Sequence, residues 1–182
     1  MKRAFKIVLL VLLALIIFAI VGLSIVFLDV AAYTATGAQT LNPSGSAIGA
    51  ALVVYDPGLT GPAHNIANKV ADNLQSRGYT VELAGIKSSK ATANIDQYKV
   101  IVVGGPIYAG NAAASVKSYL SSLKPIPGAI IGVFGVGSYN YPNQKVAPLP
   151  NGSTLTIKEA LRIDTSENAT ARSNYFVTQL LS

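Results

Sequence analysis

The sequence predicts an α/β protein built on a doubly wound parallel sheet of five strands and preceded by one N-terminal transmembrane helix. Three observations predict this architecture. Residues 51–74 read as a buried strand, a glycine-containing loop and a helix, and residues 100–123 repeat that order. Residues 7–28 contain no charged side chain. Strands that alternate with helices of this length imply βαβ units, a parallel sheet and right-handed crossovers.

The uncharged segment is long enough to cross a bilayer. A helix over residues 7–28 would span roughly 33 Å, against a hydrocarbon core of about 30 Å. Lys2, Arg3 and Lys6 precede the segment, and no Lys or Arg follows it until Lys69. The positive-inside rule therefore predicts a single-pass protein of the cell membrane, with its N-terminus cytoplasmic and its domain extracytoplasmic. A cleaved signal peptide is the alternative, although its apolar region normally covers only about 7–15 residues.

The chain divides into three parts by composition. Residues 1–29 form the predicted transmembrane anchor. Residues 30–49 are rich in Ala, Thr, Gly and Ser and carry no charge, which is typical of a flexible linker. Residues 50–182 alternate between apolar strands and amphipathic helices and form the predicted folded domain.

Within the domain, apolar runs predict strands over residues 50–55, 99–103 and 129–136, because strands buried on both faces are continuously apolar. Residues 79–83 alternate and suit an outer strand, and residues 154–162 complete the five. A helix over 62–77 follows from Ile66, Val70 and Leu74, which recur every fourth residue, and Gly78 is a natural stop. Further helices are predicted over 112–123 and 166–181. Residues 85–96 are expected to form a loop or a short turn of helix.

Composition excludes several classes of function. The chain of 182 residues has no cysteine and one histidine, which excludes disulfides and thiolate chemistry and argues against a structural zinc site. Its net charge of +6 is partly a property of the N-terminus. The basic residues of the domain are dispersed and form no stripe, which argues against nucleic acid as a partner.

The first loop runs from Asp56 through Gly58 and ends in Thr60-Gly61 at the start of a helix, where backbone N–H groups favour a phosphate. It resembles the phosphate loop of the flavodoxin family, which runs Ser/Thr-x-Thr-Gly-Asn-Thr, but Pro62 stands in place of the Asn and Ala63 in place of the last Thr. Asp56 either faces the phosphate and opposes binding or accepts loop N–H bonds and shapes the turn. A tight turn that binds nothing is the alternative for this loop.

The second loop reads Gly104-Gly105-Pro106-Ile107-Tyr108-Ala109-Gly110. It resembles the flavodoxin segment in which one residue packs on the isoalloxazine ring and a glycine-containing peptide faces the flavin N5. Tyr108 is the candidate ring-packing residue and Gly110 the residue with backbone freedom. A tyrosine that only caps the sheet edge is the alternative for Tyr108. In the third loop, the resemblance implies that backbone amides around Gly137 and Ser138 contact the pyrimidine edge of the flavin and that Tyr139 or Tyr141 covers its second ring face. Ordinary surface is the alternative.

The resemblance to flavodoxins implies the strand order 2-1-3-4-5 and a crevice at the carboxyl edge of the sheet. It further implies noncovalent FMN and an electron carrier, rather than an enzyme with its own substrate pocket, whose redox partner is a protein or a quinone. The alternatives are a membrane-associated quinone or porphyrinogen reductase and a flavin-free domain that binds a partner at the cell surface. The predicted cofactor-binding residues are Asp56, Gly58, Thr60, Gly61, Pro106, Ile107, Tyr108, Ala109, Gly110, Gly137, Ser138 and Tyr139. No catalytic residue or metal ligand is predicted.

Overall fold

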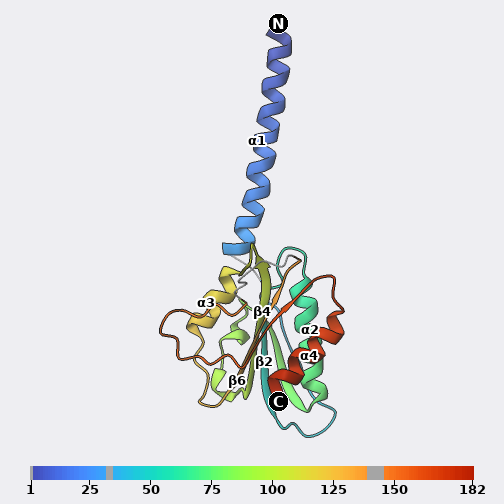
Figure 1. The fold of residues 1–182 in the computed structure, drawn as a ribbon, viewed down its shortest axis with the longest axis vertical. Coiled ribbons are helices and arrows are strands. Elements are labelled where there is room, and N and C mark those ends of the chain that lie inside the picture. The colour runs from blue at the N-terminus through green and yellow to red at the C-terminus, as the bar shows by residue number, and fades with distance from the viewer. Residues whose placement is uncertain (1, 32–34, 139–145) are drawn as a thin grey trace.

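The computed structural model describes residues 2–31, 35–138 and 146–182, which form a long helix and an α/β domain (Figure 1). The helices are α1 (Lys2–Ala31), α2 (Pro62–Ser76), α3 (Ala114–Ser122) and α4 (Ala169–Leu181), with short 3-10 helices η1 (Ser89–Ala91) and η2 (Ile95–Gln97). The strands are β1 (Ala38–Leu41), β2 (Gly49–Tyr55), β3 (Tyr79–Gly85), β4 (Val100–Tyr108), β5 (Asn111–Ala112), β6 (Ile130–Val136) and β7 (Glu159–Ile163).

The sheet has seven strands in the order β1-β3-β2-β4-β6-β7, with β5 paired to β4. The prediction of five strands in the order 2-1-3-4-5 is therefore corrected. Strands β3, β2, β4, β6 and β7 pair in parallel, whereas β1 lies antiparallel to β3 at one edge and β5 antiparallel to β4. Both additional strands are short, and neither has the apolar run that marks a buried strand.

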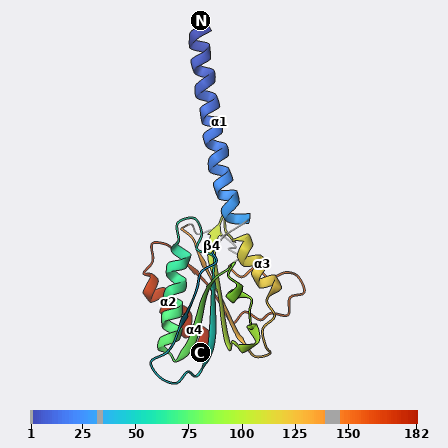
Figure 2. The same cartoon turned by 180° about the vertical axis from the view of Figure 1, so that it is seen from behind.

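Helices cover both faces of the sheet. Helices α2 and α4 lie on one face and α3 lies on the other, as the two opposite views show (Figures 1 and 2). The apolar side of α2, with Ile66, Val70 and Leu74, packs with Phe176 and Leu180 of α4 into one buried cluster. A second cluster on the opposite face joins side chains of α3 to β2, β4 and β6. The sheet is therefore buried on both sides, which explains its continuous apolar strands.

Strand β1 lies within residues 30–49, so the prediction of a linker without secondary structure is wrong for residues 38–41. The strand pairs antiparallel with β3, with Ala38 opposite Ala84 and Leu41 opposite Val81. Before the strand, the carbonyls of Ala35 and Gly37 accept hydrogen bonds from β3 and the residues that follow it. The sequence signal for strand β1 is weak, because the strand has only four residues, AQTL, and two of them are polar.

Strand β4 continues through Tyr108, although the sequence predicts a loop from Gly104 onward. The two glycines are part of the strand because neighbouring side chains occupy the space that a Cβ would need. A Cβ on Gly104 would overlap the ring of Phe134, and one on Gly105 would lie 2.5 Å from Val116 Cγ2. The remaining differences concern element ends: β7 begins at Glu159, and α4 begins after the N-cap Asn168, whose side chain accepts from the Ala171 N–H.

Helix α1 contains one segment, Lys6–Ser24, that is long and apolar enough to cross a membrane. Its side chains are exposed in the structure, and none of this segment is buried against the domain. A signal sequence near the N-terminus has the same length and apolar composition.

Candidate functional site

A cleft of about 430 Å³ lies where the loops after β2, β4, β6 and β7 meet, at the carboxyl edge of the sheet. This volume falls within the range of small-molecule and cofactor sites, roughly 300–1,000 Å³. The cleft is lined by Gly58, Leu59, Thr60, Pro62, Pro106, Ile107, Tyr108, Ala109, Val136, Gly137, Ser138 and Thr165. No charged side chain is among these lining residues, so the cleft suits a mainly apolar ligand with a few polar contacts to the backbone.

Asp56 shapes the first loop but does not line the cleft. The residue is 1% exposed. One carboxylate oxygen accepts a hydrogen bond from the Gly58 N–H at 3.0 Å, and the Ser115 hydroxyl of α3 donates to the other. Gly58 has a φ of +68°, which favours glycine. Of the two roles open to Asp56 from the sequence, the structure shows the second, a turn-forming carboxylate that ties the first loop to α3.

The start of α2 offers few phosphate ligands. Gly61 is the N-cap, with a φ of +78° and no side-chain cap, and the space around its Cα is open. Pro62 has no N–H, and the amides of His64 and Asn65 donate to the Gly61 carbonyl. Ala63 is fully buried, which leaves the exposed Thr60 hydroxyl as a donor for an anion at this helix start.

Tyr108 ends β4 and reaches across to the first loop. A Cβ on Gly58 would lie 3.2 Å from the Tyr108 hydroxyl oxygen and 3.1 Å from Pro106, so the first two loops are in close contact at the base of the cleft. The chain then turns through Ala109 (φ +47°) and Gly110 (φ +79°) into β5. This turn places the half-buried Tyr108 side chain against the cleft.

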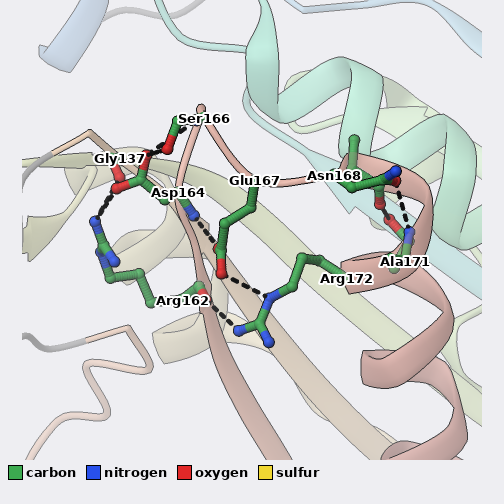
Figure 3. A network of polar contacts seen from close by, with 10 residues as sticks. Gly137, Arg162, Asp164, Ser166, Glu167, Asn168, Ala171 and Arg172 are labelled. Atoms are coloured by element: carbon green, nitrogen blue, oxygen red, sulfur yellow. Dashed lines mark hydrogen bonds and ion pairs between the residues drawn. The ribbon is translucent and has the colours of Figure 1, made fainter.

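A polar network holds the third loop in place (Figure 3). Arg162 of β7 donates to the Gly137 carbonyl at 2.9 Å and forms an ion pair with Asp164 at 2.6 Å. The pKa of Asp164 is lowered, first by a hydrogen bond from the Ser166 backbone and then by the Ser166 hydroxyl and Arg162. The Ser138 hydroxyl lies 2.9 Å from that of Thr165. The loops after β6 and β7 are thus joined where they line the cleft.

The structure brings eight of the twelve predicted site residues to the cleft: Gly58, Thr60, Pro106, Ile107, Tyr108, Ala109, Gly137 and Ser138. Asp56, Gly61 and Gly110 lie beside it without lining it, and Tyr139, like Tyr141, lies outside the described residues. The sole histidine, His64, stacks on Tyr55 with ring centroids 4.5 Å apart and lies outside the cleft.

The sequence analysis did not single out four lining residues: Leu59, Pro62 as a wall of the cleft, Val136 and Thr165. Thr165 could have been found, because the loop after a fifth parallel strand reaches the same sheet edge as the other three. The remaining three are ordinary apolar residues with no distinguishing pattern. Among the residues that the structure describes, no group of three or more His, Cys, Asp or Glu side chains could hold a metal ion.

Comparisons with known proteins give a fold and no family. No family model matches the chain, and no curated protein matches it. Among solved structures, oxidised flavodoxin 2 from Bacillus cereus is similar with a TM-score of 0.54 and 17% identity, covering 72% of this chain and 97% of that one. The flavodoxin of Streptococcus pneumonia TIGR4 gives 0.53 and 23%, with the same coverage.

The flavodiiron core of Flv1 from Synechocystis sp. PCC6803 has a TM-score of 0.54 and 16% identity, and the match covers 77% of this chain but 38% of that longer protein. These likenesses show that the chain has a flavodoxin-like fold. At these identities they show the fold alone.

Proposed function

We propose that the chain is a membrane-anchored electron-transfer protein that binds FMN noncovalently in the cleft, with its domain on the extracytoplasmic side. The observation that carries this proposal is the meeting of four strand-end loops around an uncharged cleft of about 430 Å³. The flavodoxin-like fold supports it, because ligands of such sheets lie outside the carboxyl ends of the strands, at the switch in strand order.

The residues of the cleft fit the flavin better than the phosphate. Tyr108 supplies an aromatic surface for the ring system, and the backbone around Gly137 and Ser138 supplies polar groups for its pyrimidine edge. The phosphate would depend on the Thr60 hydroxyl at the start of α2. The buried Asp56 carboxylate already accepts the Gly58 N–H, which removes one further donor.

FMN, when bound, supplies one- or two-electron chemistry, and the protein sets its potential through packing and backbone hydrogen bonds. The residues of the chain bind the cofactor and exclude water from one ring face. The reduced set of phosphate donors predicts a micromolar dissociation constant, about −8 kcal/mol, and easy loss of cofactor on purification.

The test is a fluorescence-quench titration of the purified apoprotein with FMN and, separately, with riboflavin. FMN should bind more tightly than riboflavin, because only FMN uses the α2 start. Replacing Tyr108 by Ala should weaken FMN binding by about 1–3 kcal/mol, the usual value of a large aromatic contact. Tyr175→Ala is the matched control, since Tyr175 is an exposed tyrosine of α4 away from the cleft.

Two outcomes would change the proposal. If neither flavin binds at hundreds of micromolar, the redox function fails and a surface-binding module with this fold takes its place. If FMN and riboflavin bind equally well, the cleft binds a flavin but the first loop does not bind its phosphate. Protease added to intact cells tests topology separately, because an extracytoplasmic domain should be removed once outer layers are permeabilised.

A further inference from the structure

We propose that the carboxyl edge of the sheet, where the cleft opens, rests on the surface of the bilayer that α1 spans. This inference uses the membrane anchor of the proposed function and does not depend on FMN. It concerns an interaction surface, and the partner is the lipid headgroup layer. The observations are the point at which the anchor joins the domain, the length of the connection and the side chains at that edge.

The anchor joins the domain at the carboxyl edge. The Lys87 N–H donates to the Ala35 carbonyl at 2.9 Å, and the Gly85 N–H donates to the Gly37 carbonyl at 2.8 Å. Gly85 is the last residue of β3, so these bonds fix the start of the domain at the end of the strand. In both views, α1 meets the domain near the end of β4, the strand that carries Tyr108 (Figures 1 and 2).

The connection is short compared with the domain. Asp29 is the first charged residue after the apolar segment, and the chain from Asp29 to Ala35 spans at most about 20 Å when fully extended. Strand β4 has nine residues and is about 30 Å long, so the amino and carboxyl edges of the sheet lie about 30 Å apart. The anchored edge is therefore the one that the chain keeps near the lipid.

The side chains of this edge suit a headgroup layer. Lys87 is exposed beside the Ala35 attachment, and Lys90 is exposed three residues further on. Leu59, at the lip of the cleft, is 49% exposed and is one of few large apolar side chains exposed in the described part of the domain. The two carboxylates after β7, Asp164 and Glu167, are paired with arginines. Lysines together with an exposed leucine are the side chains that bind anionic lipid surfaces.

A lipid layer over this edge restricts access to the cleft. Molecules within the bilayer or at its surface reach the cleft, whereas a large protein free in solution is kept from it. The redox partner of the proposed function would then be found in the membrane.

The experiment places a fluorescent label at either edge of the full chain. Because the natural chain has no cysteine, Leu59→Cys labels the cleft edge alone and Lys124→Cys labels the opposite edge, between α3 and β6. Each labelled protein is reconstituted in vesicles of phosphatidylcholine and phosphatidylglycerol that carry a headgroup-attached quencher. We expect several-fold stronger quenching of the label at position 59. Equal quenching at both positions, or stronger quenching at 124, would overturn the proposal.

A charge-reversal pair tests the lysines. Lys87→Glu with Lys90→Glu should reduce quenching of the position-59 label, and the effect should fade in vesicles of phosphatidylcholine alone. Lys124→Glu with Lys158→Glu is the matched control at the opposite edge and should leave the signal unchanged; an equal loss in both pairs would refute a role for this edge. Retention of α1 in the vesicles is checked by alkaline extraction, and loss of the protein there refutes anchoring and this proposal together. If the chain binds no flavin but the position-59 label is still quenched, the FMN function is refuted and the membrane contact of this edge is not.

Discussion

Removing the Asp56 carboxylate should destabilise the domain and loosen the first loop of the cleft. Asp56 is 1% exposed and holds two donors from different elements, the Gly58 N–H and the Ser115 hydroxyl. In Asp56→Ala both donors lose their acceptor. A hydrogen bond to a charged group contributes about 1.5–3 kcal/mol, and a buried donor left unpaired costs about 1–3 kcal/mol.

The two losses are unequal. Ser115 is half-buried and can turn its hydroxyl toward water, whereas the Gly58 amide is held in place by a left-handed backbone. Relief from burying a charge offsets part of the loss. The net decrease in the free energy of unfolding is therefore expected to be about 2–4 kcal/mol. Asp56→Asn should cost only about 1 kcal/mol, because its amide oxygen can accept from Gly58 while its NH₂ donates to a rotated Ser115 hydroxyl.

The assay is urea unfolding of the full chain in mild detergent, followed by far-UV circular dichroism. A double-mutant cycle with Ser115→Ala isolates the contact, and we expect a coupling energy of about 1 kcal/mol. The reasoning fails if Asp56→Ala unfolds within about 0.5 kcal/mol of the natural chain or if the two substitutions are fully additive. A riboflavin titration of Asp56→Ala would show in addition whether the loop must be fixed for the cleft to bind a flavin.

Three further predictions concern other parts of the domain. Gly104→Ala should lower the free energy of unfolding by about 3 kcal/mol or more, because the new methyl group overlaps the Phe134 ring; a stability unchanged in urea would contradict this packing. Tyr119→Phe should cost about 1–2 kcal/mol, because the buried hydroxyl donates to the Ala91 carbonyl in η1. Burial raises the pKa of Tyr119, so in a spectrophotometric titration of the natural chain this phenol should still be neutral at the ordinary tyrosine value of 10.0. Because the pKa of Asp164 is lowered in the folded state, its ionised carboxylate stabilises the fold above the ordinary value of 3.8, and this contribution should be lost as the pH falls through the lower folded pKa. Asp164→Asn should remove that part of the acid dependence of stability. An acid unfolding transition that is the same in the variant and the natural chain would refute this role of Asp164.

The sequence predicted the parallel strands β2, β4 and β6 because they are largely apolar, and β3 because polar and apolar residues alternate along it. It also predicted α2, since one side of that helix is apolar at every fourth residue. It missed β1 and β5, whose pairing is decided by neighbouring strands. The extent of β4 was missed for a related reason, since Gly104-Gly105 has the composition of a turn but is required by the rings and methyl groups that pack against it. Tertiary context overrode local preference at each of these positions.

Glycine-rich loops after buried strands are enough to locate the cleft. They do not show which loop residues face the cleft and which face the interior of the domain. Asp56 is the clearest case. Its position in the loop was known, yet the choice between facing a ligand and facing inward depends on Ser115, which is far away in the sequence. Thr165 was missed because its loop, Asp164-Thr165-Ser166-Glu167, has none of the glycines or aromatic residues that mark the other loops of the cleft.

The way β1 joins the sheet also determines how the domain responds to mechanical force. The chain enters β1 at the carboxyl edge of the sheet and runs antiparallel to β3, so a pull through α1 is directed along the strand. The hydrogen bonds between the two strands lie perpendicular to that direction and are loaded together in shear, rather than opened one after another. The bond of 2.8 Å between Thr40 and Glu82 adds a side-chain link to the same pair of strands. In the anchored protein proposed above, this four-residue strand would make the junction between α1 and the domain resistant to a lateral pull on the domain.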